Sequence, residues 1–320
     1  MASQSKKCLL TFRLPTSNRQ ISWAEFGSPT GRPVISLHGT SSCRLEFQQF
    51  HEELYEKNIR IIAPDRPGIG RSEFQPNRTI GGYASDVQAL AKHLELQEYT
   101  VMGTGVGGSF ALACARHINP DDGLKAVGVL SGIAPWDCSL NGMFWMNKIN
   151  LYMAKWNPGL FKRVYDISWP GHKELHTVPL EELVVDPSVE EKLVARMEST
   201  SEVFRPKDQE VMKRPGRRED IASTLAESFI QGTDGYIYET DLTVKKWDFK
   251  LKDIKFASDR HRPLVLWFGT EDEQMPMHMG RWMAKRISGA DFRQEAGDTH
   301  MLINLKFVKF CEELLELAQR

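Results

Sequence analysis

The turn around residue 105 is rich in glycine and lies where chemistry is often found. The run Val101-Met-Gly-Thr-Gly-Val-Gly-Gly-Ser-Phe-Ala-Leu-Ala-Cys-Ala leads from an apolar strand pattern into a helix of small residues. This arrangement is typical of the nucleophile elbow G-x-S-x-G, which holds a serine at the tip of a strained turn. Gly103 and Gly107 take the flanking glycine positions, and Gly105 stands where the serine would be. The backbone N–H groups that follow would point to the place where an oxyanion forms.

The same glycines allow a second interpretation. Gly103, Gly105 and Gly108 match G-x-G-x-x-G, the pattern of a dinucleotide-binding loop. That loop normally follows the first strand of its fold, and an acidic residue ends a later strand to bind the ribose. Here the glycines follow the fifth strand candidate, and no acidic residue stands at the expected ribose position. We therefore favour the elbow.

Two histidines four residues apart raise the question of a zinc site. His172 and His176 enclose Glu174, whereas the metalloprotease motif H-E-x-x-H needs its glutamate directly after the first histidine. The segment also follows a Trp-Pro-Gly turn. We therefore expect no metal there.

The elements that would position these residues fall into two blocks of alternating strand and helix patterns. Strand candidates occupy residues 8–14, 21–26, 33–38, 60–64, 99–102, 125–130 and 263–268 and a short run near Phe292. Helical periodicity covers residues 80–94, 106–117, 277–287 and 302–317. Such alternation predicts an α/β fold with parallel pairing and right-handed crossovers. The first two strand candidates are close enough to form a hairpin, so an antiparallel start is expected.

The intervening segment, residues 136–250, has a different texture. It is rich in aromatic residues and helical in pattern, with Pro and Gly breaks and no good parallel-strand candidate. We interpret it as a helical lid inserted into a core domain formed by residues 1–135 and 251–320. Trp136, Phe144 and Trp145 are candidates for lining a substrate pocket, although most lid aromatics are expected to form the lid's own core. The charged stretch 213–220 is expected to be a solvated surface turn.

Four further motifs stand in register with the elbow. They are Leu37-His-Gly-Thr40, Asp65-Arg-Pro-Gly-Ile-Gly-Arg-Ser72, Phe268-Gly-Thr-Glu-Asp272 and Gly297-Asp-Thr-His300. With these motifs the whole chain resembles the α/β-hydrolase fold superfamily, and most closely its short-lid fungal and bacterial members. The order elbow, acid, histidine is the order of that superfamily.

The resemblance implies a fold and a set of residue roles. The fold would be a mostly parallel eight-stranded sheet flanked by helices, with an inserted helical lid. Asp272 would be the acid and His300 the catalytic histidine, with oxyanion-hole N–H groups from Thr40 and Val106. His38 would brace the oxyanion turn.

The absent serine closes the covalent route of the family, in which a serine attacks a carbonyl. Ser109 lies one helical turn further on, and Thr104 precedes the tip, so neither is expected to replace it. The leading hypothesis is non-hydrolytic acid/base chemistry by His300 and Asp272, as an isomerase, lyase or cyclase acting on a small, largely apolar carbonyl compound in secondary-metabolite biosynthesis. In the family, hydroxynitrile lyases and cofactor-free dioxygenases follow similar logic.

Three alternatives remain open from the sequence. The chain could be a serine hydrolase of an ester, thioester or lactone, inactivated by an engineered Ser-to-Gly change at position 105. It could be a non-catalytic ligand-binding receptor, although retention of both Asp272 and His300 argues against that. Finally, His300 could activate a water for a slower hydrolysis.

Composition narrows the partners. The 320-residue chain carries 41 basic and 42 acidic residues, which gives no electrostatic reason to expect nucleic acid or an anionic membrane surface. Its five cysteines are scattered without CxxC spacing, which favours a reducing compartment. The N-terminus lacks an apolar signal region, and no apolar run is long enough to span a bilayer. We expect a cytoplasmic protein with a small-molecule substrate and no cofactor; the oligomeric state is left open.

Overall fold

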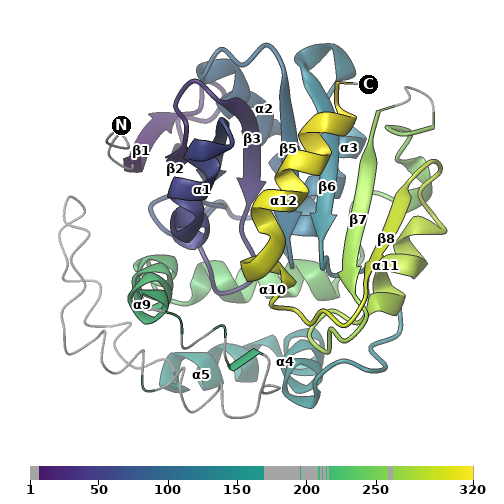
Figure 1. Ribbon diagram of the computed structural model, residues 1–320. Coiled ribbons are helices and arrows are strands. Elements are labelled where there is room, and N and C mark those ends of the chain that lie inside the picture. The colour runs from purple at the N-terminus through teal and green to yellow at the C-terminus, as the bar shows by residue number, and fades with distance from the viewer. Residues whose placement is uncertain are drawn as a thin grey trace.

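The sheet of the molecule has eight strands in the order β1-β2-β4-β3-β5-β6-β7-β8 (Figure 1). A computed structural model describes residues 7–168, 195, 208–209, 211, 214, 216–258 and 262–319. β1 pairs antiparallel with β2, and β2 antiparallel with β4, while all other neighbours are parallel. The prediction of a mostly parallel eight-stranded sheet flanked by helices is confirmed, including its antiparallel start.

The strands follow the apolar runs of the sequence closely. Their bounds are β1 Lys7–Arg13, β2 Gln20–Gly27, β3 Arg32–Leu37, β4 Ile59–Pro64, β5 Tyr99–Thr104, β6 Leu124–Leu130, β7 Leu264–Gly269 and β8 Asp291–Glu295. β5 and β7 are buried along their whole length, as expected for central strands covered on both faces. Among the described strands, only β1 and β8, at the two edges of the sheet, contain exposed residues.

Two helical layers cover the sheet. The core helices are α1 His51–Glu56, α2 Tyr83–His93, α3 Gly107–His117, α11 Met277–Ala284 and α12 Leu302–Leu317, with short 3-10 helices η1 Arg44–Phe50, η2 Pro120–Asp122 and η3 Leu251–Asp253. α2 and α3 pack on one face through a core that includes Leu90 and Phe110. α1 and α12 pack on the opposite face through Leu54 and Phe307 (Figure 1).

Four further described helices separate β6 from β7. These are α4 Trp145–Trp156, α5 Pro158–Ser168, α9 Arg217–Ser228 and α10 Asp234–Val244. They lie beyond the end of the sheet toward which the arrowheads of β3 and β6 point, where ligands of α/β folds bind (Figure 1). The division into a core domain and a lid over residues 136–250 stays a prediction.

Aromatic residues of this segment divide between the inside and the outside. Phe161 is fully buried and packs against Tyr165 and Tyr236, so it belongs to a core between these helices. Trp156, by contrast, is 74% exposed. Trp169, His172 and His176 lie outside the described residues.

The second half of the charged stretch 213–220 is helical. The prediction of a solvated turn is wrong from Arg217 onward, because α9 begins at that residue and its side chain is partly buried. Sequence polarity could not reveal this, because Arg217 lines a cavity that forms only when distant segments of the chain come together. Among the described helices, none has the length and apolar character needed to cross a membrane.

Candidate active site

The glycine turn between β5 and α3 brings three chain segments into close contact. A Cβ on Gly107 would lie 2.1 Å from the carbonyl oxygen of Leu37, so only glycine allows α3 to start against the end of β3. Gly105 has a φ of +52°, a conformation that costs a non-glycine residue energy. Its N–H donates to the carbonyl oxygen of Leu130 at 3.0 Å. A Cβ built on Gly105 meets nothing nearer than the Cα of Gly39, at 3.7 Å, so the tip of the turn faces open space.

His300 and Asp272 form an ion pair at the edge of that space. The Nδ1 of His300 lies 2.9 Å from the Oδ2 of Asp272. The other carboxylate oxygen, Oδ1, accepts the backbone N–H groups of Gln274 and Met275, both at 2.8 Å. Asp272 is therefore fixed in orientation and selects the His300 tautomer that carries its proton on Nδ1. Among the described residues, nothing hydrogen-bonds to Nε2 of His300.

The electrostatic surroundings favour a protonated His300. Burial by itself lowers the pKa of this imidazole, but the charge and hydrogen bond of Asp272, together with the charges of other nearby acids, outweigh burial and raise the pKa above its ordinary value. Glu46 adds to the increase, and Asp208 contributes further. His300 thus sits beside several acids, of which Asp272 matters most.

Arg66 binds the turn that follows β3. This turn, residues 38–40, is called the oxyanion turn after the role predicted for it. This guanidinium donates to the carbonyl oxygens of His38 at 2.5 Å and Gly39 at 3.0 Å, and it binds both carboxylate oxygens of Glu239 on α10. Burial and the nearby Arg66 charge lower the pKa of His38 well below its ordinary range, so its ring is neutral. His38 contacts the carbonyl oxygen of Gly39 through Nδ1, which places it as a brace of the turn.

Thr40 and Val106 both line the cavity in front of this turn. Within the described part of the chain, neither backbone N–H is paired with an acceptor. Two unpaired amides at the edge of a cavity are available to a ligand oxygen. The structure therefore brings Thr40, Val106, Gly105 and His300 to one place.

Glu46 is a cavity residue that the sequence reasoning missed. It belongs to the short 3-10 helix η1, and its Oε2 accepts the Gly39 N–H at 2.7 Å. Its Oε1 accepts the hydroxyl of Thr104 at 2.6 Å. The carboxylate thus ties the oxyanion turn to the residue before Gly105. Its position seven residues after the His-Gly turn, as the only acid in a segment of one arginine, two glutamines and three apolar residues, was the available signal.

The nearby hydroxyls are committed elsewhere. Ser109 is fully buried, and its Oγ donates to the carbonyl oxygen of Val106 at 2.8 Å. Thr104 donates to Glu46 and not to His300. The expectation that neither replaces the serine is consistent with these contacts.

A cavity of about 740 Å³ connects these groups to the lid helices. Phe144 and Trp145, two of the predicted pocket residues, line it. Trp136 does not: it borders a separate, smaller cavity, packs edge-on against Tyr152 at 5.6 Å, and lies under the ammonium group of Lys155. The prediction for Trp136 is therefore wrong, because contacts with α4 turn the indole away from His300.

The family can now be stated. The sequence matches the model of the alpha/beta hydrolase family over residues 34–306, a range that includes Gly105, Asp272 and His300. The chain belongs to the alpha/beta hydrolase family. An esterase from Exiguobacterium antarcticum has a similar structure, with a TM-score of 0.63 and 18% identity over 97% of this chain and 99% of the esterase. At that identity the likeness concerns the fold alone.

Relatives with higher identity match this alpha/beta hydrolase over shorter stretches. A proline iminopeptidase from Xylella fastidiosa is 31% identical over 104 residues, which cover 31% of this chain and 32% of the relative. A non-heme haloperoxidase from Rhodococcus erythropolis is 30% identical over 128 residues, covering 39% and 45%. The chain thus matches less than half the length of these relatives.

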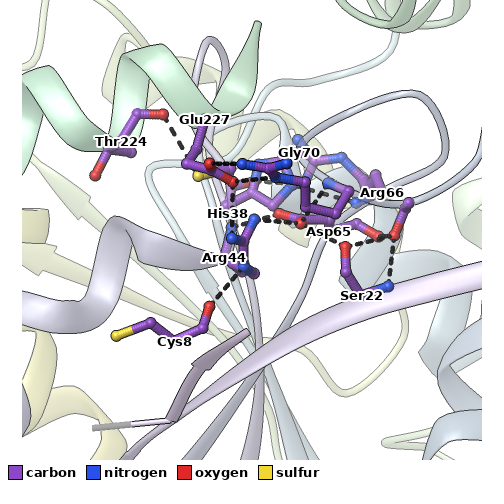
Figure 2. Close-up of polar contacts among 12 residues, drawn as sticks. Cys8, Ser22, His38, Arg44, Asp65, Arg66, Gly70, Thr224 and Glu227 are labelled. Atoms are coloured by element: carbon purple, nitrogen blue, oxygen red, sulfur yellow. Dashed lines mark hydrogen bonds and ion pairs between the residues drawn. The ribbon is translucent and has the colours of Figure 1, made fainter. Parts of the chain in front are cut away.

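Buried ion pairs hold α9 against η1 and the loop after β4. Arg44 binds Asp65 after β4 at 2.9 Å and Glu227 of α9 at 2.7 Å, and it lies between the two in Figure 2. Arg71 also binds Glu227, at 2.5 Å. The loop that carries the D-x-P-G-x-G-x-S motif therefore has a structural role: it anchors the helix that forms one wall of the cavity.

The described residues include side chains of the types that could bind a metal ion, namely His, Cys, Asp and Glu. Across the described ranges, no three His, Cys, Asp or Glu side chains are grouped so that they could hold a metal ion. The chemistry of the described site is that of a buried imidazole, its carboxylate partners and backbone amides.

Proposed function

We propose that this alpha/beta hydrolase-family protein transfers protons on a carbonyl-containing metabolite, as an isomerase, lyase or cyclase, without forming an acyl-enzyme. One observation carries the proposal: His300 keeps its ion pair with Asp272, but the position that would hold its nucleophile partner is Gly105. Among the described residues, no hydroxyl or thiol is bonded to Nε2 of His300.

The groups in place match the needs of such a reaction. Nε2 of His300 would accept a proton from the carbon next to the substrate carbonyl, and the electrons of the C–H bond would move toward the carbonyl oxygen to give an enolate. The N–H groups of Thr40 and Val106 would stabilise that oxygen. His300 would then return the proton to a different carbon of the enolate in an isomerase. In a cyclase the enolate carbon would attack a second carbonyl of the same substrate, and the proton would go to the alkoxide so formed. In a lyase the enolate would expel a group from its β-carbon as the carbonyl re-forms, and the proton would go to that leaving group. Asp272 would stabilise the imidazolium formed between these steps.

The cavity supports a small, largely apolar substrate. Its walls carry Met143, Phe144, Ile149, Leu225 and Met275 beside the polar groups near His300, and ligand pockets of this size commonly hold metabolite-sized molecules. We propose that the reaction belongs to secondary-metabolite biosynthesis. We also propose that the protein is a short-lid member of its family in which Gly105 replaces the elbow serine.

A second candidate is a serine hydrolase that has lost its nucleophile at position 105. The geometry favours it in one respect, since a Cβ at Gly105 would have room. Relatives with names such as proline iminopeptidase support it too. The protein as it stands would then bind an ester or amide without forming an acyl-enzyme.

The proposal is tested by proton exchange, because this readout does not require the natural substrate. The wild-type protein should accelerate the exchange of the α-protons of 1-tetralone in D₂O, measured by NMR. His300→Gln should remove about 10²-fold or more of this acceleration, in line with the usual contribution of a general base. His278→Gln, a histidine bonded to the carbonyl oxygen of Ser139 outside the cavity, is the control and should keep the wild-type rate. Equal rates in wild type and His300→Gln would contradict the proposal.

A further inference from the structure

Arg217 places a positive charge in the wall of the cavity. It is the first residue of α9, and Ile221, Thr224 and Leu225 line the cavity from the same helix. Spacings of four, seven and eight residues put these side chains on one face of a helix, so the guanidinium belongs to the cavity-facing side of α9. Solvated charges normally avoid such a face, which is why the position of Arg217 is informative.

The guanidinium uses little of its hydrogen-bonding capacity. Its Nη2 donates to the side-chain oxygen of Asn304, while Nε is buried and has no acceptor in the part of the chain that the structure describes. A guanidinium carries five N–H donors in a planar fork. Among the described residues, no carboxylate forms an ion pair with Arg217. Burial lowers the pKa of this group, with only partial compensation from the more distant Asp220 and Glu46.

The nearest cavity acid is occupied elsewhere. Glu46 accepts hydrogen bonds from the Gly39 N–H and the Thr104 hydroxyl, so both of its oxygens are engaged at the oxyanion turn. Asn304 accepts the one hydrogen bond that Arg217 donates from its side chain among the described residues, and it lies one helical turn after His300. Arg217 is therefore anchored to the same turn of chain that presents the catalytic imidazole.

We propose that Arg217 binds a carboxylate of the substrate. The substrate would then be an amphipathic acid, with an anionic end at Arg217, an apolar body along the lid helices and its reacting carbonyl near His300. A partly buried guanidinium whose Nε lacks an acceptor among the described residues gains most from a planar anion that it can bind through two parallel hydrogen bonds. A monoanion fits better than a phosphate dianion, because one cation beside the negative charge of Glu46 cannot balance two further charges.

The inference rests on the proposed function only in taking this cavity as the substrate site, and its test involves no turnover. The probes are 2-naphthoate and 2-naphthamide, which share an apolar body and differ in charge. Their dissociation constants would be measured by calorimetry for the wild type, Arg217→Gln, Arg217→Lys and Arg214→Gln. Arg214 precedes α9, is exposed and is absent from the cavity wall, although its charge acts on Arg217. Arg214→Gln therefore removes a neighbouring positive charge without removing a hydrogen-bond donor from the cavity.

The wild type should bind naphthoate about 10-fold or more tightly than naphthamide, as expected for charge-assisted hydrogen bonds. Arg217→Gln should abolish this preference, Arg217→Lys should keep part of it, and Arg214→Gln should keep all of it. Equal affinity of the wild-type protein for both probes would overturn the proposal, and so would an undiminished preference in a folded Arg217→Gln. Since binding and proton exchange are separate readouts, failure of the exchange assay leaves this result standing on its own.

Discussion

His300 lines the cavity. Among the described residues, His300 has one hydrogen-bond partner, Asp272 at Nδ1, and its Nε2 has none. In a serine hydrolase that nitrogen would be committed to the nucleophile, and the imidazole would act on its proton. Gly105 removes that commitment, so Nε2 can act on the substrate itself. The acids near His300, chiefly Asp272 and then Glu46 and Asp208, raise its pKa and so affect the pH at which it can accept a proton.

The first prediction concerns the pKa of His300. Burial lowers this pKa, but Asp272 and the other nearby acids together outweigh burial. The titration midpoint, followed by NMR, should therefore lie above the ordinary value of about 6.5. Asp272→Asn should lower the midpoint most and Glu46→Gln less. Glu313→Gln, an acid that pairs with Arg293 outside the cavity, should leave it unchanged.

The pH dependence follows from the direction of that shift. Because the folded protein raises the pKa, the imidazolium stabilises the fold below the unfolded pKa, and this stabilisation is lost as pH rises through the folded value. Activity as a base should rise over the same interval, since His300 must be neutral to accept a proton. A midpoint below 6.5, or one insensitive to Asp272→Asn, would refute this electrostatic account.

Sequence reasoning located the residues that lie in motifs and missed those that reach the site by packing. Gly105, Asp272 and His300 each follow a strand and stand in a recognisable loop, so local pattern was sufficient to nominate them. Glu46 and Arg217 depend on which way a short helix and a lid helix face, and a single sequence does not contain that information. Trp136 is the opposite case. Its aromatic character suggested that it lines the substrate cavity, but it borders a separate, smaller cavity.

Among the elements, α9 and α10 depend on charged contacts to stay over the site. Glu239 of α10 binds Arg66, which also holds the oxyanion turn, and Glu227 of α9 binds Arg44 and Arg71. These pairs are almost completely shielded from solvent. Loss of one partner would leave a buried charge without compensation, which is far more costly than loss of a surface pair.

Glu227→Gln should therefore destabilise the protein by about 3–5 kcal/mol, measured by chemical denaturation. Glu312→Gln is the matched control: its pair with the half-exposed Lys57 should contribute only about 0–1 kcal/mol. Burial would raise the pKa of Glu227, but the hydrogen bonds and charges of Arg71 and Arg44 outweigh it and lower the pKa. Its contribution should thus be present above the unfolded pKa and disappear as pH falls through the lowered value. A loss for Glu227→Gln no larger than that of the control would contradict the anchoring role.

On the scale of the whole molecule, the alternation of strand and helix patterns was enough to predict the sheet and its place in the α/β class. Strands such as β5 and β7 are buried throughout because both faces are covered, and their largely apolar sequences make them easy to identify. The arrangement of the helices between β6 and β7 could not be predicted from the sequence, because contacts with distant loops determine which side of each helix faces the cavity. Arg44 and Glu227, which are 183 residues apart in sequence, illustrate such a contact.

The comparison of wild type with Gly105→Ser tests the central claim most directly. Both proteins would be assayed for 1-tetralone proton exchange in D₂O and for hydrolysis of p-nitrophenyl butyrate. If His300 acts on substrate protons, the wild type exchanges tetralone, and the introduced hydroxyl does not raise that rate, because it would occupy Nε2. Absence of exchange in the wild type, together with a large gain of ester hydrolysis in Gly105→Ser, would contradict the claim and identify a serine hydrolase deprived of its nucleophile.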